Sequence, residues 1–258
     1  MKILITGGNG YIARRVAQQL SSEYEVTTIT RADLDLTDQD ACRLYFYNRS
    51  FDVIIHTAIQ GGSRLKEDDD KVLENNIKMY YNLINTGGKY AKFISFGSGA
   101  EVGHPDDYYG LSKHVIAKSM LTKPNCYNIR IYAVFDYDEL DTRFIKANLI
   151  KYAHKEDMII HQNKLMDFFY MDDLISVVKY YITEKNPPKE INCNYLESKT
   201  LLQIAEMINR LDKHRVGIRI LRDGYDKSYI GSWHGLALPL VGLEQGLINT
   251  YNIIKAQL

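Results

Sequence analysis

Along its first half the chain alternates between short, almost wholly apolar runs and longer segments in which apolar residues recur every three or four positions. Five runs have the composition of buried strands: residues 1–6, 24–30, 51–59, 91–97 and 126–135. Amphipathic helices are predicted within residues 7–20, 38–49, 71–90 and 108–122. The third of these is expected to end near Gly87 and Gly88, which supply a C-cap. Buried strands that alternate with helices predict a parallel sheet covered on both faces, the doubly wound α/β arrangement of Rossmann folds.

After about Phe135 the alternation becomes irregular. Helices are predicted at residues 142–154, 200–211 and 242–255, and strands at 191–196 and 217–221. We therefore expect a dinucleotide-binding Rossmann domain over residues 1–135. Residues 136–258 are expected to form a small C-terminal α/β lobe that faces the substrate, with elements that return to the Rossmann core.

Composition excludes several classes of protein. The 258 residues are 45% hydrophobic and 25% charged, and 32 basic residues balance 32 acidic ones. Because there is no excess of positive charge to attract nucleic acid, a nucleic-acid-binding protein is not expected. The cysteines Cys42, Cys126 and Cys193 are far apart and odd in number, which favours buried thiols over disulfides or a zinc site. No leader precedes the first strand and no apolar run spans a bilayer, so we expect a cytoplasmic protein that binds neither membrane nor metal.

A glycine turn joins the first strand to the first helix in the sequence TGGNGYIA. Gly7 allows a tight turn, Gly10 allows close approach of a pyrophosphate, and Ala13 permits tight packing of helix on sheet. The helix start adds the positive end of its dipole. Because the turn lies between a strand and a helix, it predicts a dinucleotide site.

Arg31 stands near the end of the second strand, where an NAD-binding chain usually has an acidic residue. A guanidinium at this place suits the 2′-phosphate of NADP(H). The alternative is an exposed surface charge. We favour NADP(H), with NAD(H) as the alternative.

Six segments in order, TGGNGYIA, DLDLTD, HTAI, SFGSGAEVG, YYGLSK and FFYMDDL, resemble the extended short-chain dehydrogenase/reductases that modify nucleotide sugars. The resemblance covers most of the chain. It implies a Rossmann domain, a nicotinamide cofactor, a nucleotide-diphosphate sugar as substrate and, commonly, a homodimer.

By this resemblance the catalytic residues are Ser98, Tyr109 and Lys113, because Tyr109 and not Tyr108 has a lysine four positions later. Ser98 and Gly99 are expected to contact the substrate. The remaining cofactor contacts are expected at the glycine turn, along the second strand and in the third strand and helix: Gly7, Gly10, Tyr11, Ile12, Arg31, Asp35, Leu36, Ala58 and Asn76.

The spacing of Tyr109 and Lys113 has a chemical reason. Residues four apart share one face of a helix. An ammonium near a phenol favours the phenolate and moves a pKa of about 10 toward neutral pH. The tyrosine then exchanges a proton with a sugar oxygen while hydride moves to or from nicotinamide. The alternative, a solvated helix face, is disfavoured by Ser98 and the glycine turn.

Three reactions use these groups. Dehydration is disfavoured because Gly99, Ala100 and Glu101 follow Ser98 without the usual acidic pair, which leaves Glu101 as a lone acid. The chain looks most like the NADPH-dependent ketoreductases of the GDP-fucose synthase type, but Ala100 replaces their cysteine base. We therefore favour simple reduction of a 4-keto nucleotide sugar for glycan precursor synthesis. A C4-epimerase with bound NAD is the alternative, and a non-catalytic NADP sensor is less favoured.

The substrate half departs most from the family. AVFDY replaces the usual NVYGP, and Met166 replaces an arginine. Arg143 and Lys146, with Lys164, are candidate contacts for the substrate diphosphate, although each is also typical of surface charge.

Overall fold

A computed structural model describes residues 1–63, 66–233 and 237–258 of the protein. The chain divides into two compact units. The first contains residues Met1–Arg130 and Val178–Ile191, and the second contains Ile131–Val177 and Asn192–Leu258. The chain therefore leaves the first unit after residue 130 and returns to it at residue 178.

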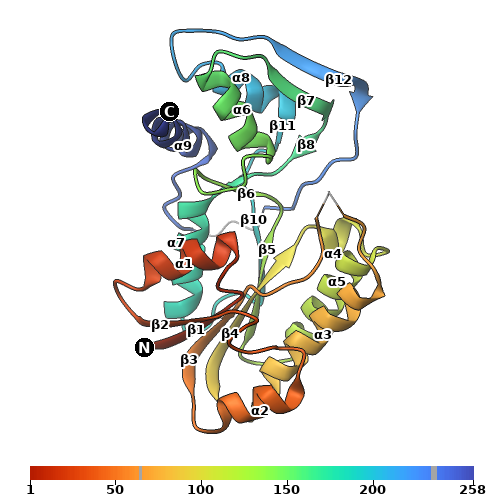
Figure 1. The fold of residues 1–258 in the computed structure, drawn as a ribbon, viewed down its shortest axis with the longest axis vertical. Helices are drawn as coiled ribbons and strands as arrows, with labels where there is room; N and C mark the ends of the chain where they lie inside the picture. The colour runs from red at the N-terminus through yellow and green to blue at the C-terminus, as the bar shows by residue number, and fades with distance from the viewer. Residues whose placement is uncertain (64–65, 234–236) are drawn as a thin grey trace. The chain divides into compact units, whose positions relative to one another are not determined.

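A six-stranded sheet with strand order β10-β5-β4-β3-β1-β2 organises the first unit (Figure 1). Its strands are β1 (Lys2–Thr6), β2 (Glu25–Ile29), β3 (Phe51–His56), β4 (Tyr90–Ser98), β5 (Cys126–Ile131) and β10 (Glu190–Cys193). The ladders β1–β2, β1–β3 and β3–β4 are parallel. The predicted doubly wound parallel sheet is confirmed. From β1 the chain builds first toward β2 and then on the opposite side toward β3, so the strand order reverses between β1 and β3, the place where such sheets bind ligands.

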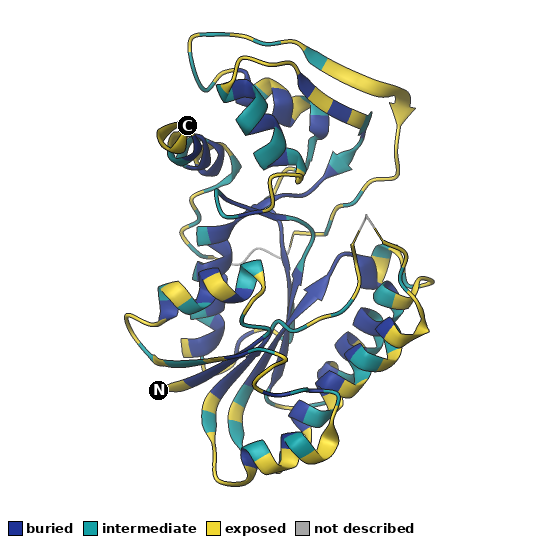
Figure 2. Ribbon diagram, in the orientation of Figure 1, coloured by how far each residue is buried: buried dark blue, intermediate teal, exposed yellow. Residues whose placement is uncertain are grey.

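Helices cover both faces of this sheet. They are α1 (Tyr11–Leu20), α2 (Gln39–Tyr47), α3 (Asp70–Ile84), α4 (Ala100–Gly103), α5 (Tyr108–Leu121) and the end of α7 (Met171–Thr183). Figure 1 shows α1 and α7 on one side of the strands and α3 and α5 on the other. All of the strands except the edge strand β2 are buried along most of their length, while the outer faces of the helices are exposed (Figure 2). Burial on both faces explains the uninterrupted apolar runs of the sequence.

Side-chain caps set several helix starts. The Asp38 carboxylate accepts the N–H groups of residues 40 and 41 at the start of α2. The Asp107 carboxylate accepts the N–H of Gly110 at 2.5 Å at the start of α5. Such caps satisfy N–H groups that have no partner within the helix. The cap at Asp107 places Tyr108 and Tyr109 in the first turn of α5.

The second unit has its own core. Its helices are α6 (Phe144–Ala153), the first part of α7, α8 (Leu201–Ile208) and α9 (Leu243–Gln257). Its strands pair two by two: β7 (Met158–Asn163) with β12 (Ile218–Tyr225), β8 (Leu165–Met166) with β11 (Lys199–Thr200), and β6 (Val134–Phe135) with β9 (Phe169–Tyr170). Apolar side chains such as Leu149, Tyr152, Ile160 and Ile204 are fully buried in this core.

Several predicted boundaries were wrong, among them the ends of the strands expected over residues 51–59 and 191–196, which end at His56 and Cys193. Two further differences have a clear structural cause. The strand expected over residues 126–135 is two strands, because β5 ends at Ile131 and β6 pairs with β9 of the second unit. The helix expected over residues 71–90 ends at Ile84 with Asn85 as its C-cap. Gly87 and Gly88, with φ of 68° and 79°, form the following turn instead of the cap.

Candidate active site

The glycine turn follows β1 directly and meets the end of β3. Gly7 has φ of 70°, and a Cβ at this position would lie 2.9 Å from backbone atoms of Ala58. Gly10 is the N-cap of α1, and its N–H donates to the carbonyl of Gly7 at 2.8 Å. Tyr11 and Ile12 begin α1 and are partly exposed, while Ala13 is buried. The turn thus leaves backbone N–H groups and a helix start beside the switch point of the sheet, an arrangement suited to a diphosphate.

Arg31 and Asp35 form an ion pair after β2, with Arg31 Nη2 3.1 Å from Asp35 Oδ2. The Arg31 side chain is 73% exposed, so its guanidinium is accessible from solvent. The other oxygen of Asp35 accepts the hydroxyl and N–H of Thr37, and these bonds lower the pKa of the carboxyl. Leu36 is buried, and its carbonyl accepts an N–H of Asn82 at 2.8 Å.

Asn76 of α3 is fully buried and joins two segments of the site. Its amide oxygen accepts the N–H of Gln60, in the loop after β3, at 2.8 Å. Its amide nitrogen donates to the Ser112 hydroxyl at 3.0 Å, next to Lys113 in α5. Ala58 lies in the same loop region, and its N–H donates to the Thr6 hydroxyl at 3.2 Å. Asn76 therefore fixes the loop after β3 against α5.

Lys113 is buried, and its ammonium donates to the carbonyl of Phe96 in β4 at 2.6 Å. The ammonium lies 5.9 Å from the centre of the Tyr109 ring, one helical turn earlier. Burial lowers the pKa of Lys113 to about 8, and the negative charge of Glu101 opposes this effect. Burial, together with the positive charge of Lys113, lowers the pKa of His56 to about 3, so His56 is neutral.

The loop after β3 also contacts the Tyr109 ring. Gly62 has φ of 70°, and a Cβ there would lie 2.8 Å from Tyr109 Cζ. Its N–H donates to the Asp68 carboxylate at 2.9 Å, which holds the loop in place. Only a residue without a side chain fits this close contact at a positive φ.

Ser98 is the last residue of β4, at the carboxyl end of the sheet. Its hydroxyl accepts the N–H of Ala100 at 3.2 Å. Gly99 is the N-cap of the one-turn helix α4 that follows. Ser98, Tyr109 and Lys113 thus belong to adjoining elements of the first unit, because Lys113 is bonded to the strand that ends with Ser98.

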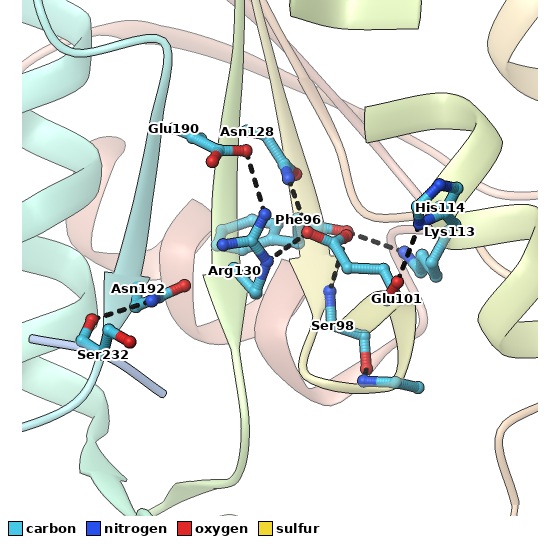
Figure 3. Close-up of polar contacts among 11 residues, drawn as sticks. Phe96, Ser98, Glu101, Lys113, His114, Asn128, Arg130, Glu190, Asn192 and Ser232 are labelled. Atoms are coloured by element: carbon cyan, nitrogen blue, oxygen red, sulfur yellow. Dashed lines mark hydrogen bonds and ion pairs between the residues drawn. The ribbon is translucent and has the colours of Figure 1, made fainter. Parts of the chain in front are cut away.

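Glu101, considered from the sequence as a lone acid, is not available as one. Its carboxylate is buried and points toward β5, where it forms an ion pair with Arg130 and accepts an N–H of Asn128 at 3.0 Å (Figure 3). Its second oxygen accepts the N–H of Ser98 at 3.3 Å. The contacts of Glu101 with Asn128 and Arg130 were not predicted from the sequence. Their spacing of two along β5 was the available signal, because alternate residues of a strand share a face.

Arg143 and Lys146 lie in the second unit and are engaged in local ion pairs there. Arg143 precedes α6, and its Nε lies 3.8 Å from a Glu139 oxygen. The Lys146 ammonium lies 2.8 Å from Asp141 and also donates to the carbonyl of Glu139. Lys164 pairs with Asp226 at 2.9 Å.

Within residues 1–63, 66–233 and 237–258, no three His, Cys, Asp or Glu side chains are grouped to hold a metal ion. Among the helices of these same ranges, none combines the length and the apolar character required to cross a membrane.

The strand order, the glycine turn at its switch point and the Tyr109–Lys113 pair are features of the extended short-chain dehydrogenase/reductase class. Residues 3–193 match the sequence profile of the NAD dependent epimerase/dehydratase family. The chain belongs to this family. Through this family it is a member of the short-chain dehydrogenase/reductase superfamily.

Similar proteins include a synthase, an epimerase and a reductase. The chain is 28% identical to a GDP-L-colitose synthase of Yersinia pseudotuberculosis over 163 residues, which are 61% of this chain and 49% of that protein. It therefore spans about half the length of this relative.

Two solved structures share the fold. A UDP-glucose 4-epimerase of Thermotoga maritima, solved with UDP-glucose, is 18% identical with a TM-score of 0.79, covering 100% of this chain and 99% of that one. A GDP-mannoheptose C4 reductase of Campylobacter jejuni, solved with NADP, is 16% identical with a TM-score of 0.74, covering 97% of each chain.

Proposed function

We propose that the protein reduces a 4-keto nucleotide sugar with NADPH, for the synthesis of a glycan precursor. The buried ammonium of Lys113 carries this proposal. It is bonded to β4 at Phe96, two residues before Ser98, and lies 5.9 Å from the centre of the Tyr109 ring, so a cation is held near a phenol at the carboxyl end of the sheet. Burying a cation is unfavourable, and such perturbed groups gather at functional sites.

The residues of the first unit fit a nicotinamide dinucleotide. A side chain at Gly7 would fill the space beside Ala58, and the N–H groups at the start of α1 are suited to the diphosphate. The Arg31 guanidinium is accessible to a 2′-phosphate, which would replace Asp35 as its ion-pair partner. Tyr11, Ile12, Leu36 and Asn76 complete the proposed set. The bound dinucleotide supplies hydride to the substrate carbonyl carbon.

Three side chains then act on the substrate oxygen. Tyr109 donates its phenolic proton to the oxygen at C4 as negative charge develops there. Lys113 stabilises the resulting phenolate through its nearby ammonium. Ser98 donates a hydrogen bond to the same oxygen and orients it, with Gly99 beside it. Arg143 and Lys146 are proposed to bind the substrate diphosphate.

The surroundings of Glu101 support reduction over dehydration. A dehydratase needs an acid that reaches the leaving hydroxyl. Here one oxygen of the Glu101 carboxylate faces Arg130 and Asn128, and the other accepts the Ser98 N–H. Both oxygens are committed within the protein, so Glu101 has no proton to deliver at the sugar.

The test is turnover by the purified chain. It is incubated with NADPH and a panel of 4-keto nucleotide sugars, and the loss of NADPH absorbance is followed while products are identified by NMR. We expect reduction at C4 with at least one sugar. Isomerisation of a non-keto nucleotide sugar without net consumption of cofactor would instead establish a C4-epimerase.

Two neighbouring tyrosines provide a matched pair of variants. Tyr109→Phe is expected to lower kcat by about 10²–10⁴-fold, the usual contribution of a positioned acid, with dinucleotide affinity retained. Tyr108→Phe changes an exposed side chain in the same turn and is expected to keep full activity. Equal activity of the two variants would refute the assignment of Tyr109. A chain that binds NADPH but turns over no sugar would favour a sensor.

A further inference from the structure

A buried ion pair lies directly behind the proposed catalytic groups. Glu101 and Arg130 have side chains that are 2% and 9% exposed, and they come from α4 and β5. Taking two charges out of water is costly, and purely for stability an apolar pair of similar volume serves as well or better. Stability alone therefore does not explain a buried ion pair at this place, next to Ser98 and α5.

Glu101 contacts Ser98 and α5 on one side and β5 on the other (Figure 3). One carboxylate oxygen accepts the backbone N–H of Ser98 at 3.3 Å. The backbone carbonyl of Glu101 is bonded to Nδ1 of His114 at 2.9 Å, and His114 follows Lys113 in α5. Glu101 thus joins the strand end that presents Ser98 to the helix that presents Lys113.

The strand beside Glu101 is shaped for its carboxylate. A Cβ on Gly97 would lie 2.8 Å from Glu101 Oε2 and 2.5 Å from Asn128 Oδ1, so only glycine leaves room for these groups. Arg130 is held from its other side by Glu190, with Nη2 and Oε2 2.9 Å apart. Arg130 therefore bridges a buried carboxylate and an outer one that is 37% exposed.

The negative charge of Glu101 affects the protonation of Lys113. The Lys113 ammonium donates to the Phe96 carbonyl from β4 and lies near the Tyr109 ring of its own helix. It also interacts electrostatically with His56 from β3 and with Glu101 from α4. His56 is neutral, as shown above, so the negative charge among these groups is that of Glu101. Burial favours the neutral amine of Lys113, and Glu101 opposes it. Arg130 in turn favours the ionised form of Glu101, whose pKa is raised by burial.

We infer that Glu101 is a positioning residue of the active site, which holds the backbone of Ser98 and keeps Lys113 in its ammonium form, with Arg130 as its fixed counter-ion. The link to catalysis rests on the proposed function. The effect of Glu101 on the protonation of Lys113 does not rest on the proposed function, because it can be measured in the protein without substrate or cofactor. Glu101 contacts no substrate atom in this scheme and acts through Ser98 and Lys113.

The experiment measures Lys113 itself. The titration of its 13Cε resonance is followed by NMR in the chain labelled at lysine, and the signal is assigned by its loss in Lys113→Arg. In Glu101→Gln we expect the midpoint of Lys113 to fall by on the order of one pH unit, the size of effect that a nearby opposite charge exerts. Glu190→Gln removes the outer carboxylate from Arg130 and is expected to leave the midpoint unchanged. An unchanged midpoint in Glu101→Gln, or an equal shift in both variants, would overturn the inference.

A second variant guards against misfolding. Glu101→Met with Arg130→Met removes the pair together and leaves no buried charge without its partner. If Glu101 had only a structural role, the titration midpoint of Lys113 in this folded double variant would equal that of the wild type. We expect the midpoint to be lower. Where the wild-type chain turns over a sugar, the alkaline limb of kcat/KM moves to lower pH in parallel. Absence of turnover by the wild type would refute the proposed function, and the Lys113 titration would still decide the inference.

Discussion

The stability of the first unit should depend strongly on Arg130. In Arg130→Met the Glu101 carboxylate keeps its buried position and its bonds to Ser98 and Asn128 but loses its counter-ion. Removal of one partner from a buried pair costs about 3–5 kcal/mol, because a charge is left without compensation. For a chain of 258 residues this corresponds to a fall in Tm of about 6–10 °C, at roughly 2 °C per kcal/mol.

The loss should depend on pH with a defined sign. Burial already raises the pKa of Glu101, and loss of the guanidinium raises it further above the unfolded value of about 4.3. A carboxyl with a raised folded pKa supports the folded state below its unfolded pKa, and this support is lost as pH rises through the folded pKa. Arg130→Met should therefore lie closest to the wild type in acid and fall progressively behind it from about pH 4 upward.

The assay is urea and thermal unfolding at several pH values, with two controls. Glu101→Met combined with Arg130→Met should recover much of the lost stability, since no lone charge remains. Lys179→Met breaks the exposed pair with Glu23, whose side chains are 35% and 48% exposed, and should cost at most about 1 kcal/mol. A single variant as stable as the exposed control, or a double variant as unstable as Arg130→Met, would refute this account of the pair.

Three further predictions concern the cofactor and the tyrosine. Arg31→Ala should weaken binding of NADPH far more than binding of NADH, measured by fluorescence titration, and equal losses would remove the 2′-phosphate argument. Gly62→Ala should lower kcat because its Cβ would lie 2.8 Å from the Tyr109 ring, whereas Gly87→Ala, with φ of 68° and no atom within 4 Å, should change stability alone. Comparable kcat values in the two glycine variants would contradict the packing argument. Finally, kcat/KM of the wild type should decline above about pH 8 as the Lys113 ammonium is lost, and a profile that stays level through pH 10 would exclude this role.

The architecture of the first unit was predictable because its signals are local. The strands β1, β3 and β4 are buried on both faces and appear as apolar runs, and the next helix after β1 and after β3 has ten residues or more. The glycine turn likewise combines a strand end, a positive φ and a helix start within a few residues. Hydrophobic periodicity and glycine placement are sufficient to detect such features.

The parts that were missed depend on distant partners. Glu101 and Arg130 are 29 residues apart, and neither segment reveals alone that their side chains meet. The strands β6, β8, β9 and β11 contain two residues each, too few for any periodicity. Arg143 and Lys146 were selected for their charge, and the structure places both in local ion pairs with acids of the preceding loop.

The return of the chain to the first unit has a consequence for synthesis on the ribosome. The β5 strand is almost wholly buried, and its partner on the outer side, β10, is translated only after the intervening residues of the second unit. Until then the nascent chain presents a strand with an unpaired edge, the kind of surface that templates aggregation. Lys189 then joins the new segment to the start of β5 by donating to the carbonyl of Pro124 at 2.7 Å. Premature termination within residues 131–177 should therefore yield an insoluble product, and a chaperone that shields the β5 edge during translation should raise the yield of the folded chain.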